Sequence, residues 1–238
     1  MFEIGSKLGI APFVHGLVGY WKFDEGSGTT ANDSSGFGYN GILTDGPTWT
    51  TGKINSAISL DGLNDRVQNF PSSTPFRYVG GNMTLMAWFK PHINDADAGN
   101  IFSKPWNGSG EYNYMLTLNS NDTLTLDIRG STAWSVNAPP ALSAGNWHHL
   151  AFTINASKAV NIYIDGSLVK DTAHNIADWN PLNGDLNQSF LLGCLYPYGA
   201  GWAGNTGYCV QGDLDEVFVY NSRSLSAAEI KAIYNATK

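Results

Sequence analysis

Short runs of alternating apolar and polar residues cover most of the chain, and clusters of Gly, Asn, Asp and Pro separate them. A period of two is typical of a β-strand with one buried face. Runs of this kind are LVGYWKF (17–23), NGILTDG (40–46), SAISLDG (56–62), DRVQNF (65–70), MTLMAWFK (83–90), NIFSK (100–104), YNYMLTL (112–118), TLTLDIR (123–129), WHHLAFTI (147–154), VNIYIDG (160–166), SFLLG (189–193) and LDEVFVYN (214–221). Many short strands with turn residues between them predict an antiparallel sandwich or barrel.

One pair of these runs predicts a hairpin. Residues 112–118 and 123–129 both alternate, and the four residues NSND (119–122) connect them. A connection this short joins antiparallel neighbours in a sheet.

One helix is predicted, at the end of the chain. Ser226 stands three residues before Glu229, which is the spacing of a capping box. Leu225 and Ile230 are placed to form a hydrophobic staple across the start of that helix. The helix then has one apolar face, which we expect to dock on the sandwich, formed by Ile230, Ile233 and Tyr234.

Composition limits the partners and the location. The chain has 238 residues, a formal net charge of -7, a sequence pI near 5.0 and only 14% charged residues. No basic patch is visible, so we expect no nucleic-acid partner and no membrane insertion. Few charges with many Gly, Asn, Ser, Thr and aromatic residues are typical of an extracellular or cell-surface β-protein. As an isolated domain it is expected to be a monomer.

We divide the chain into an N-terminal extension or linker, residues 1–16, and one domain, residues 17–238. Residues 1–16 have no basic start and no long apolar run, so they are neither a signal peptide nor a membrane span as they stand. No repeat or low-complexity linker divides the rest.

Two cysteines, Cys194 and Cys209, enclose a loop with four aromatic residues, four glycines and no charge. They could be free thiols, a disulfide or half of a metal site, and no cluster of His and Cys completes a zinc pattern. In an extracellular setting a disulfide is favoured, with the two Cα atoms within about 7 Å of each other.

Several segments resemble the laminin-G-like, concanavalin A-like lectin and glucanase jelly-roll domains. They are residues 17–43, 52–62, 83–91, the pair 147–154 and 160–169, and 212–235, which come in the family's order. The resemblance implies an all-β fold, an antiparallel β-sandwich jelly roll with one C-terminal helix. It leaves the function open, because lectins, adhesion modules, glycosidases and lyases share this fold.

The resemblance also implies a structural calcium ion where the first and last strands adjoin. Calcium prefers carboxylate and carbonyl oxygens from loops and strand ends. The positions that match the family's pattern are Asp24, Asn40, Gly41 and Asp215, with Asp33 and Asp213 in reserve. The alternative is that these acids only cap turns or accept hydrogen bonds.

The sequence offers little support for catalysis. No glutamate begins the Glu-x-Asp-x-x-Glu pattern of the β-glucanases of this fold, and alternation sends Asp215 and Glu216 to opposite faces. The signatures of alginate lyases are missing, TDGPTW (44–49) is one residue short of a sialidase Asp-box, and no motif supports a serine or cysteine nucleophile. His148 and His149 read as strand histidines, one inward and one outward.

Exposed aromatic residues in loops favour sugar binding, because the C–H face of a sugar ring stacks on Trp or Tyr while amides meet its hydroxyls. The candidates are Tyr196, Tyr198, Trp202, Asn205 and Tyr208 in the 194–209 loop, and Trp106, Trp134 and Trp179 in other loops. The alternative is that these rings pack onto their own sheet.

Three hypotheses for the function follow. The first is a non-catalytic carbohydrate-binding or adhesion module with a structural calcium ion. The second is a glycosidase or polysaccharide lyase with unfamiliar catalytic residues. The third is a structural spacer that binds nothing.

Overall fold

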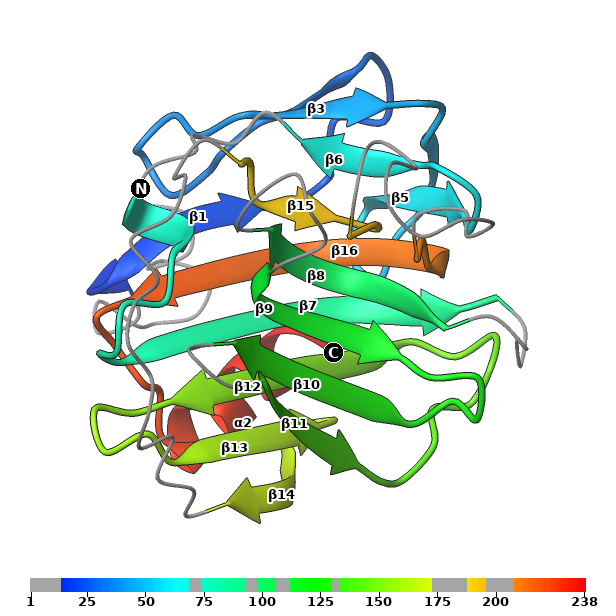
Figure 1. The fold of residues 1–238 in the computed structure, drawn as a ribbon. Coiled ribbons are helices and arrows are strands. Elements are labelled where there is room, and N and C mark those ends of the chain that lie inside the picture. Colours follow the sequence, from blue (N-terminus) through cyan, green and yellow to red (C-terminus); the bar gives the residue numbers. More distant parts are fainter. Residues whose placement is uncertain are drawn as a thin grey trace.

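Two antiparallel sheets lie face to face with the hydrophobic core between them (Figure 1). This computed structural model describes residues 14–68, 74–92, 98–105, 112–129, 133–172, 188–195 and 208–238. Within those residues each sheet has eight strands, and the sandwich fold predicted from the alternation is confirmed.

The first sheet has β16 near its centre. Its strand order is β14 (Ser167–Thr172), β13 (Val160–Ile164), β12 (His148–Ile154), β7 (Met83–Pro91), β16 (Gln211–Asn221), β5 (Ser56–Asp61) and β4 (Thr48–Thr51). β1 (Leu17–Trp21) also pairs with β16, so the first and last strands of the described chain are neighbours.

The second sheet lies in front of the first in Figure 1. Its strand order is β11 (Ala133–Ala138), β10 (Leu124–Arg129), β9 (Tyr112–Leu118), β8 (Gly99–Pro105), β15 (Leu191–Leu192), β6 (Arg66–Gln68), β3 (Gly41–Thr44) and β2 (Thr30–Ala31). The predicted hairpin is β9–β10, with Leu118 opposite Leu124. A short 3-10 helix, η2 (Thr74–Phe76), lies beside the core.

Alternation decides which side chains of the second sheet enter the core. Phe102, Leu116, Leu126 and Val136 are paired across β8, β9, β10 and β11, and all four are buried in one cluster. Apart from Ile101, which lies at a β-bulge and is buried in the same cluster, their sequence neighbours point away from the first sheet, as does Asn100 beyond the bulge. We call the surface that carries those neighbours the outer face of the second sheet.

Helix α2 (Ala227–Thr237) covers the opposite side of the sandwich, behind the first sheet (Figure 1). Ser226 is its N-cap and forms the predicted capping box with Glu229. Ile230 and Ile233 are buried against the first sheet in a cluster with Met86, Tyr163 and Phe218, because they lie on one face of the helix. The predicted helix and its docking face are confirmed.

Candidate functional site

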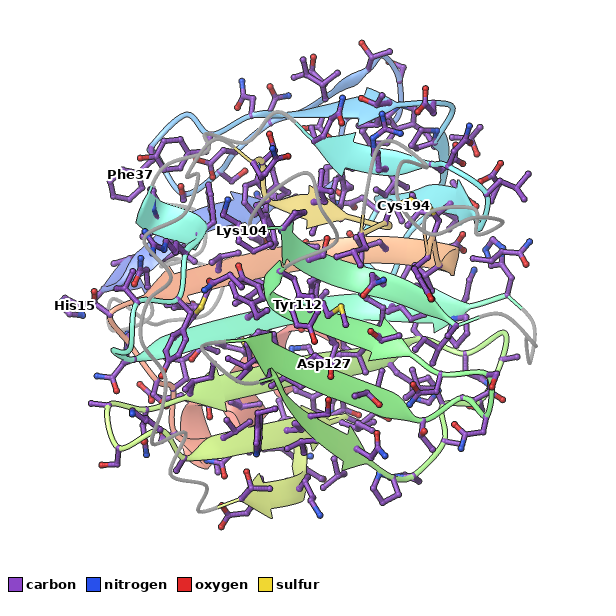
Figure 2. The ribbon with its side chains drawn as sticks, viewed as in Figure 1. His15, Phe37, Lys104, Tyr112, Asp127 and Cys194 are labelled. Carbon is purple, nitrogen blue, oxygen red and sulfur yellow. A yellow bond between two sulfur atoms is a disulfide. The ribbon has the colours of Figure 1, made fainter. Side chains whose placement is uncertain are left out.

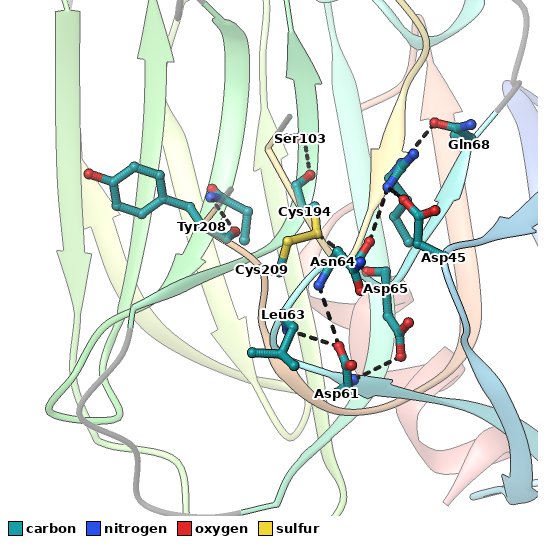
Figure 3. The surroundings of a disulfide bond; sticks show 12 residues. Asp45, Asp61, Leu63, Asn64, Asp65, Gln68, Ser103, Cys194, Tyr208 and Cys209 are labelled. Carbon is teal, nitrogen blue, oxygen red and sulfur yellow. Dashed lines mark hydrogen bonds and ion pairs between the residues drawn. A yellow bond between two sulfur atoms is a disulfide. The ribbon is translucent and has the colours of Figure 1, made fainter. Parts of the chain in front are cut away.

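The 194–209 loop is closed at its base by a disulfide (Figure 3). The Cα atoms of Cys194 and Cys209 are 4.1 Å apart, inside the predicted limit, and both residues are buried. The disulfide prediction is therefore confirmed. Of the loop itself, Leu195 and Tyr208 belong to the described residues.

Hydrogen bonds tie the loop base onto β8 of the second sheet. The backbone amide of Asn100 donates to the Tyr208 carbonyl at 2.9 Å, and its side-chain amide donates to the same oxygen at 3.1 Å. Ser103 Oγ donates to the Cys194 carbonyl at 2.7 Å (Figure 3). At Gly99 a Cβ atom would lie 2.4 Å from Val210 Cα, so this close approach requires glycine.

Asn100 begins a row of polar side chains across the outer face of the second sheet. The register places its members opposite one another on four strands: Asn100, Thr117, Thr125 and Asn137. Thr117 Oγ1 donates to Asn100 Oδ1 at 3.0 Å, and Asn119 Nδ2 donates to Thr125 Oγ1 at 2.8 Å. Amides and hydroxyls both donate and accept, which is the chemistry that sugar hydroxyls require.

Ser103 begins a second row beside the first, formed by Ser103, Met115, Asp127 and Ser135. Asp127, labelled on β10 in Figure 2, accepts a hydrogen bond from Ser135 Oγ. Burial raises the pKa of Asp127, although the hydrogen bond from Ser135 opposes that shift. The two rows give this face hydroxyls, amides and one carboxyl group. Sequence reasoning missed them, although Thr and Asn at the outward positions of the hairpin were a usable signal.

The predicted aromatic residues divide into two groups. Tyr208 is exposed at the loop base, and Trp134 on β11 is partly buried against the core. The other predicted ligand-binding residues lie outside the described residues: Trp106, Trp179, Tyr196, Tyr198, Trp202 and Asn205.

Two of the predicted calcium ligands lie together at the junction of β1 and β16. Asp215 is fully buried, and its carboxylate accepts from Ile54 N at 2.9 Å and from Glu216 N at 2.8 Å. Asp24 accepts from the side chain of Asn55, the residue after Ile54, at 3.1 Å. Burial, with the nearby charges of Glu216 and Asp24, raises the pKa of Asp215 to about 8 against the hydrogen bonds from the two amides.

The other two predicted ligands lie at the start of β3. Asn40 Oδ1 accepts from the Asp33 amide at 2.9 Å, and Gly41 pairs with Ala31 in the β2–β3 ladder. The Asp33 carboxylate in turn accepts from Ser35 and from the amides of Tyr20 and Tyr39. The reserve residue Asp213 forms an ion pair with Lys90 at 2.5 Å, and its Oδ1 lies in hydrogen-bond contact with His92 Nε2 at 2.6 Å.

A β-bulge at Glu216 corrects one prediction. Leu214 and Val217 are both in the core cluster, and the register of β16 against β7 shifts between Asp215 and Phe218. The extra residue leaves Asp215 and Glu216 on the same side of the first sheet, not on opposite faces. The Tyr20 hydroxyl donates a hydrogen bond to Glu216 Oε2 on that side.

Comparison with known families identifies the fold. A family model described as the concanavalin A-like lectin/glucanases superfamily matches residues 61–231. The chain belongs to this superfamily. Among the curated proteins no sequence matches it.

Solved structures share the fold at low sequence identity. The binding domain of Paraclostridial Mosquitocidal Protein 1 has a TM-score of 0.71 and 17% identity, covering 94% of this chain and 52% of that one. The chain therefore spans about half the length of that domain. A second structure is domain 4 of AbnA, an extracellular arabinanase from Geobacillus stearothermophilus, in complex with arabinotriose. It has a TM-score of 0.65 and 21% identity, and the match covers 93% of this chain and 98% of that domain. A Trypanosoma rangeli sialidase has a TM-score of 0.66 and 14% identity, and the match covers 92% of this chain and 32% of the sialidase chain.

Proposed function

We propose that the chain is a carbohydrate-binding or adhesion module of an extracellular or cell-surface protein. Its binding surface is the outer face of the second sheet together with the 194–209 loop. The observation that carries this proposal is the attachment of the loop base to Asn100 and Ser103, the first members of the two polar rows. A loop rich in aromatic residues thus begins beside two rows of amides and hydroxyls, of which Asn100 and Ser103 are buried and Ser135 and Asn137 are exposed.

This combination matches the two kinds of surface on a sugar. Aromatic rings cover the C–H face of a pyranose or furanose, and amides and hydroxyls satisfy its hydroxyl groups. The loop contains no Lys or Arg, so the proposed ligand is a neutral or weakly acidic glycan. Binding at this surface requires no cleavage of a bond. The arabinotriose complex of the arabinanase domain supports the proposal by analogy of fold.

A glycan array tests the proposal against its alternatives. The wild-type chain is expected to retain a restricted set of neutral or weakly acidic glycans. Retention of none favours a structural spacer, and glycan products in the array eluate favour a glycosidase or lyase. Both results count against the module that we propose.

We also propose that a structural calcium ion binds where β1 and β16 adjoin. Asp24 and Asp215 supply carboxylate oxygens, and positive charge there would favour the ionised form of Asp215. Among the residues that the structure describes, no three His, Cys, Asp or Glu side chains form a group that could hold a metal ion. Backbone and amide oxygens must therefore complete the set, and the proposal keeps Asn40 and Gly41 as their source.

Calcium is expected to raise the stability of the domain. At free calcium about ten times its dissociation constant, the free energy of unfolding should increase by about 1.4 kcal/mol, because only the folded chain holds the site. Melting curves in chelator and in millimolar calcium measure this. Asp215→Asn should abolish the response, and Asp171→Asn on β14 should keep it. Superimposable wild-type curves would overturn the calcium proposal.

A further inference from the structure

Ser143, His148 and Asp165 form a hydrogen-bonded line outside the proposed sugar-binding surface. His148 Nε2 lies 2.9 Å from Ser143 Oγ, and His148 Nδ1 lies 3.0 Å from Asp165 Oδ2. Ser143 belongs to the connection between β11 and β12, His148 begins β12, and Asp165 is in the turn between β13 and β14. The order hydroxyl, imidazole, carboxylate is that of an activated nucleophile, its general base and the group that orients the base.

The contacts of the ring fix its tautomer. The backbone amide of Ser143 donates to His148 Nε2 at 3.1 Å. Because an amide nitrogen only donates, Nε2 of the neutral ring must be the acceptor, and the proton is on Nδ1 facing Asp165. When Nε2 takes up a proton, the Ser143 carbonyl oxygen at 3.4 Å and Oγ can accept it. This ring can therefore receive a proton at the atom that faces the hydroxyl.

Asp165 is held in place from three sides. Its Oδ1 accepts from the His149 amide at 2.9 Å, its amide donates to the His149 carbonyl at 2.8 Å, and its carbonyl accepts from Lys231 on α2 at 3.2 Å. Partial burial alone would raise the pKa of Asp165, but the hydrogen bonds from His148 and His149 outweigh burial and lower it. A fixed, ionised carboxylate orients the imidazole so that Nε2 faces Ser143.

Ser143 is exposed, and the loop around it is anchored. The Leu142 amide donates to the Asp122 carbonyl at 2.8 Å and the Gly145 amide to the Pro91 carbonyl at 2.7 Å. Asn146 Nδ2 donates to Ser143 Oγ at 3.1 Å. Among the described residues the Ala144 amide, directly after Ser143, has no acceptor. Ala144 N and Asn146 Nδ2 are the donors beside Oγ that could stabilise an oxyanion.

We propose that Ser143, His148 and Asp165 are a Ser-His-Asp triad that hydrolyses carboxylic esters. Ser143 Oγ attacks the ester carbonyl carbon and its proton passes to His148 Nε2. The carbonyl carbon–alkoxy oxygen bond breaks, the alcohol leaves with that proton, and the acyl group stays on Ser143. Water then attacks the acyl-serine and loses a proton to His148, which returns it to Ser143 Oγ as the carboxylic acid leaves. The sum is ester plus water to acid plus alcohol.

The proposed ligand class narrows the natural ester. If the chain binds glycans, the natural substrate is an acyl ester of a sugar hydroxyl. Only this choice of substrate rests on the proposed function. Ester cleavage itself is independent of glycan binding. An array without a bound glycan therefore leaves the triad proposal intact, and an inert Ser143 leaves the binding proposal intact.

Covalent labelling of the full chain tests the triad. A fluorophosphonate is expected to modify Ser143, identified by peptide mass spectrometry, and the chain should hydrolyse 4-nitrophenyl acetate. Ser143→Ala and His148→Gln should each lower that hydrolysis at least ~100-fold and abolish the label. The matched control is Ser157→Ala, another exposed serine in a turn, which should keep both.

Melting temperatures separate catalysis from folding. Ser143 is exposed, so Ser143→Ala should melt within a few degrees of the wild type. If Ser143 only ordered the local backbone, its replacement would lower the melting temperature, and the wild-type protein would not react with the fluorophosphonate. If His148→Gln does not fold, the labelling of Ser143 decides alone. An unlabelled Ser143, or equal hydrolysis by wild type and Ser143→Ala, overturns the proposal.

Discussion

Replacing both cysteines by alanine is expected to lower the free energy of unfolding by about 3 kcal/mol, because the bond closes a loop of about sixteen residues in the unfolded chain. Cys194 is fully buried and Cys209 nearly so, and alanine leaves no unpaired polar group at either position. Urea unfolding of the wild type and of the double variant measures the difference.

The loop base gives the same experiment a second readout. Ser103 and Asn100 bind the carbonyls of Cys194 and Tyr208, so the loop ends stay near β8 without the bond, but the segment between them loses its covalent closure. We expect glycan affinity to fall as well, because a less ordered loop loses more entropy on binding. Reduced wild-type protein is the control and should behave like the double variant. Equal unfolding midpoints for oxidised and reduced protein would contradict the prediction.

Acid is expected to destabilise the domain by about 3 kcal/mol through His149 alone. This side chain is 1% exposed, and its ring centroid lies 5.4 Å from that of Trp88 and 5.9 Å from that of Tyr234. Among the described residues, neither of its ring nitrogens has a hydrogen-bond partner. Burial lowers its pKa from 6.5 to about 4, although the charge of Asp165 opposes this.

The sign follows from proton uptake. Between pH 6.5 and about 4 the unfolded chain binds a proton at His149 and the folded chain does not, so stability falls as pH falls through that window. Asp215 and Asp65, whose pKa values burial raises to about 8 and about 6, act in the opposite direction. The His149 contribution is therefore the difference between wild type and a variant at each pH.

His149→Phe is the informative variant. It replaces an unpartnered buried ring by an apolar one, so we expect equal or higher stability at pH 7 and a stability gain over the wild type that grows to about 3 kcal/mol by pH 4. His15→Gln is the control, since His15 is exposed, and should leave the pH profile unchanged. A constant difference between His149→Phe and wild type from pH 7 to 4 would contradict the account.

Local sequence signals predicted the elements that depend on local chemistry. The capping box at Ser226 and Glu229 set the start of α2, and the NSND turn with alternation on both sides set the β9–β10 hairpin. The disulfide was predicted from the two cysteines and the expected extracellular location. The helix and hairpin predictions succeeded because the residues that decide them are close in sequence. The disulfide prediction succeeded because the chain has only two cysteines that could pair.

Features that depend on register could not be predicted in the same way. The bulge at Glu216 adds one residue to β16, and no period in the sequence marks it. The polar rows need the pairing of β8, β9, β10 and β11. Ser143 and Asp165 meet His148 only because β12 pairs with β13 and the β11–β12 connection folds back. No sequence motif for a serine nucleophile exists here, since Ser143 lies in the β11–β12 connection, His148 at the start of β12 and Asp165 in the turn between β13 and β14.

The affinity of one array-selected glycan, measured by calorimetric titration, tests the central claim most directly. The account predicts that Trp202→Ala in the loop and Thr125→Val in the first polar row each weaken binding several-fold, about 1 kcal/mol, with melting temperatures near the wild-type value. Thr48→Val, at an exposed position on β4 in the other sheet, should bind like the wild type. Unchanged affinity in both Trp202→Ala and Thr125→Val would contradict the claim that the outer face of the second sheet and the 194–209 loop bind sugar.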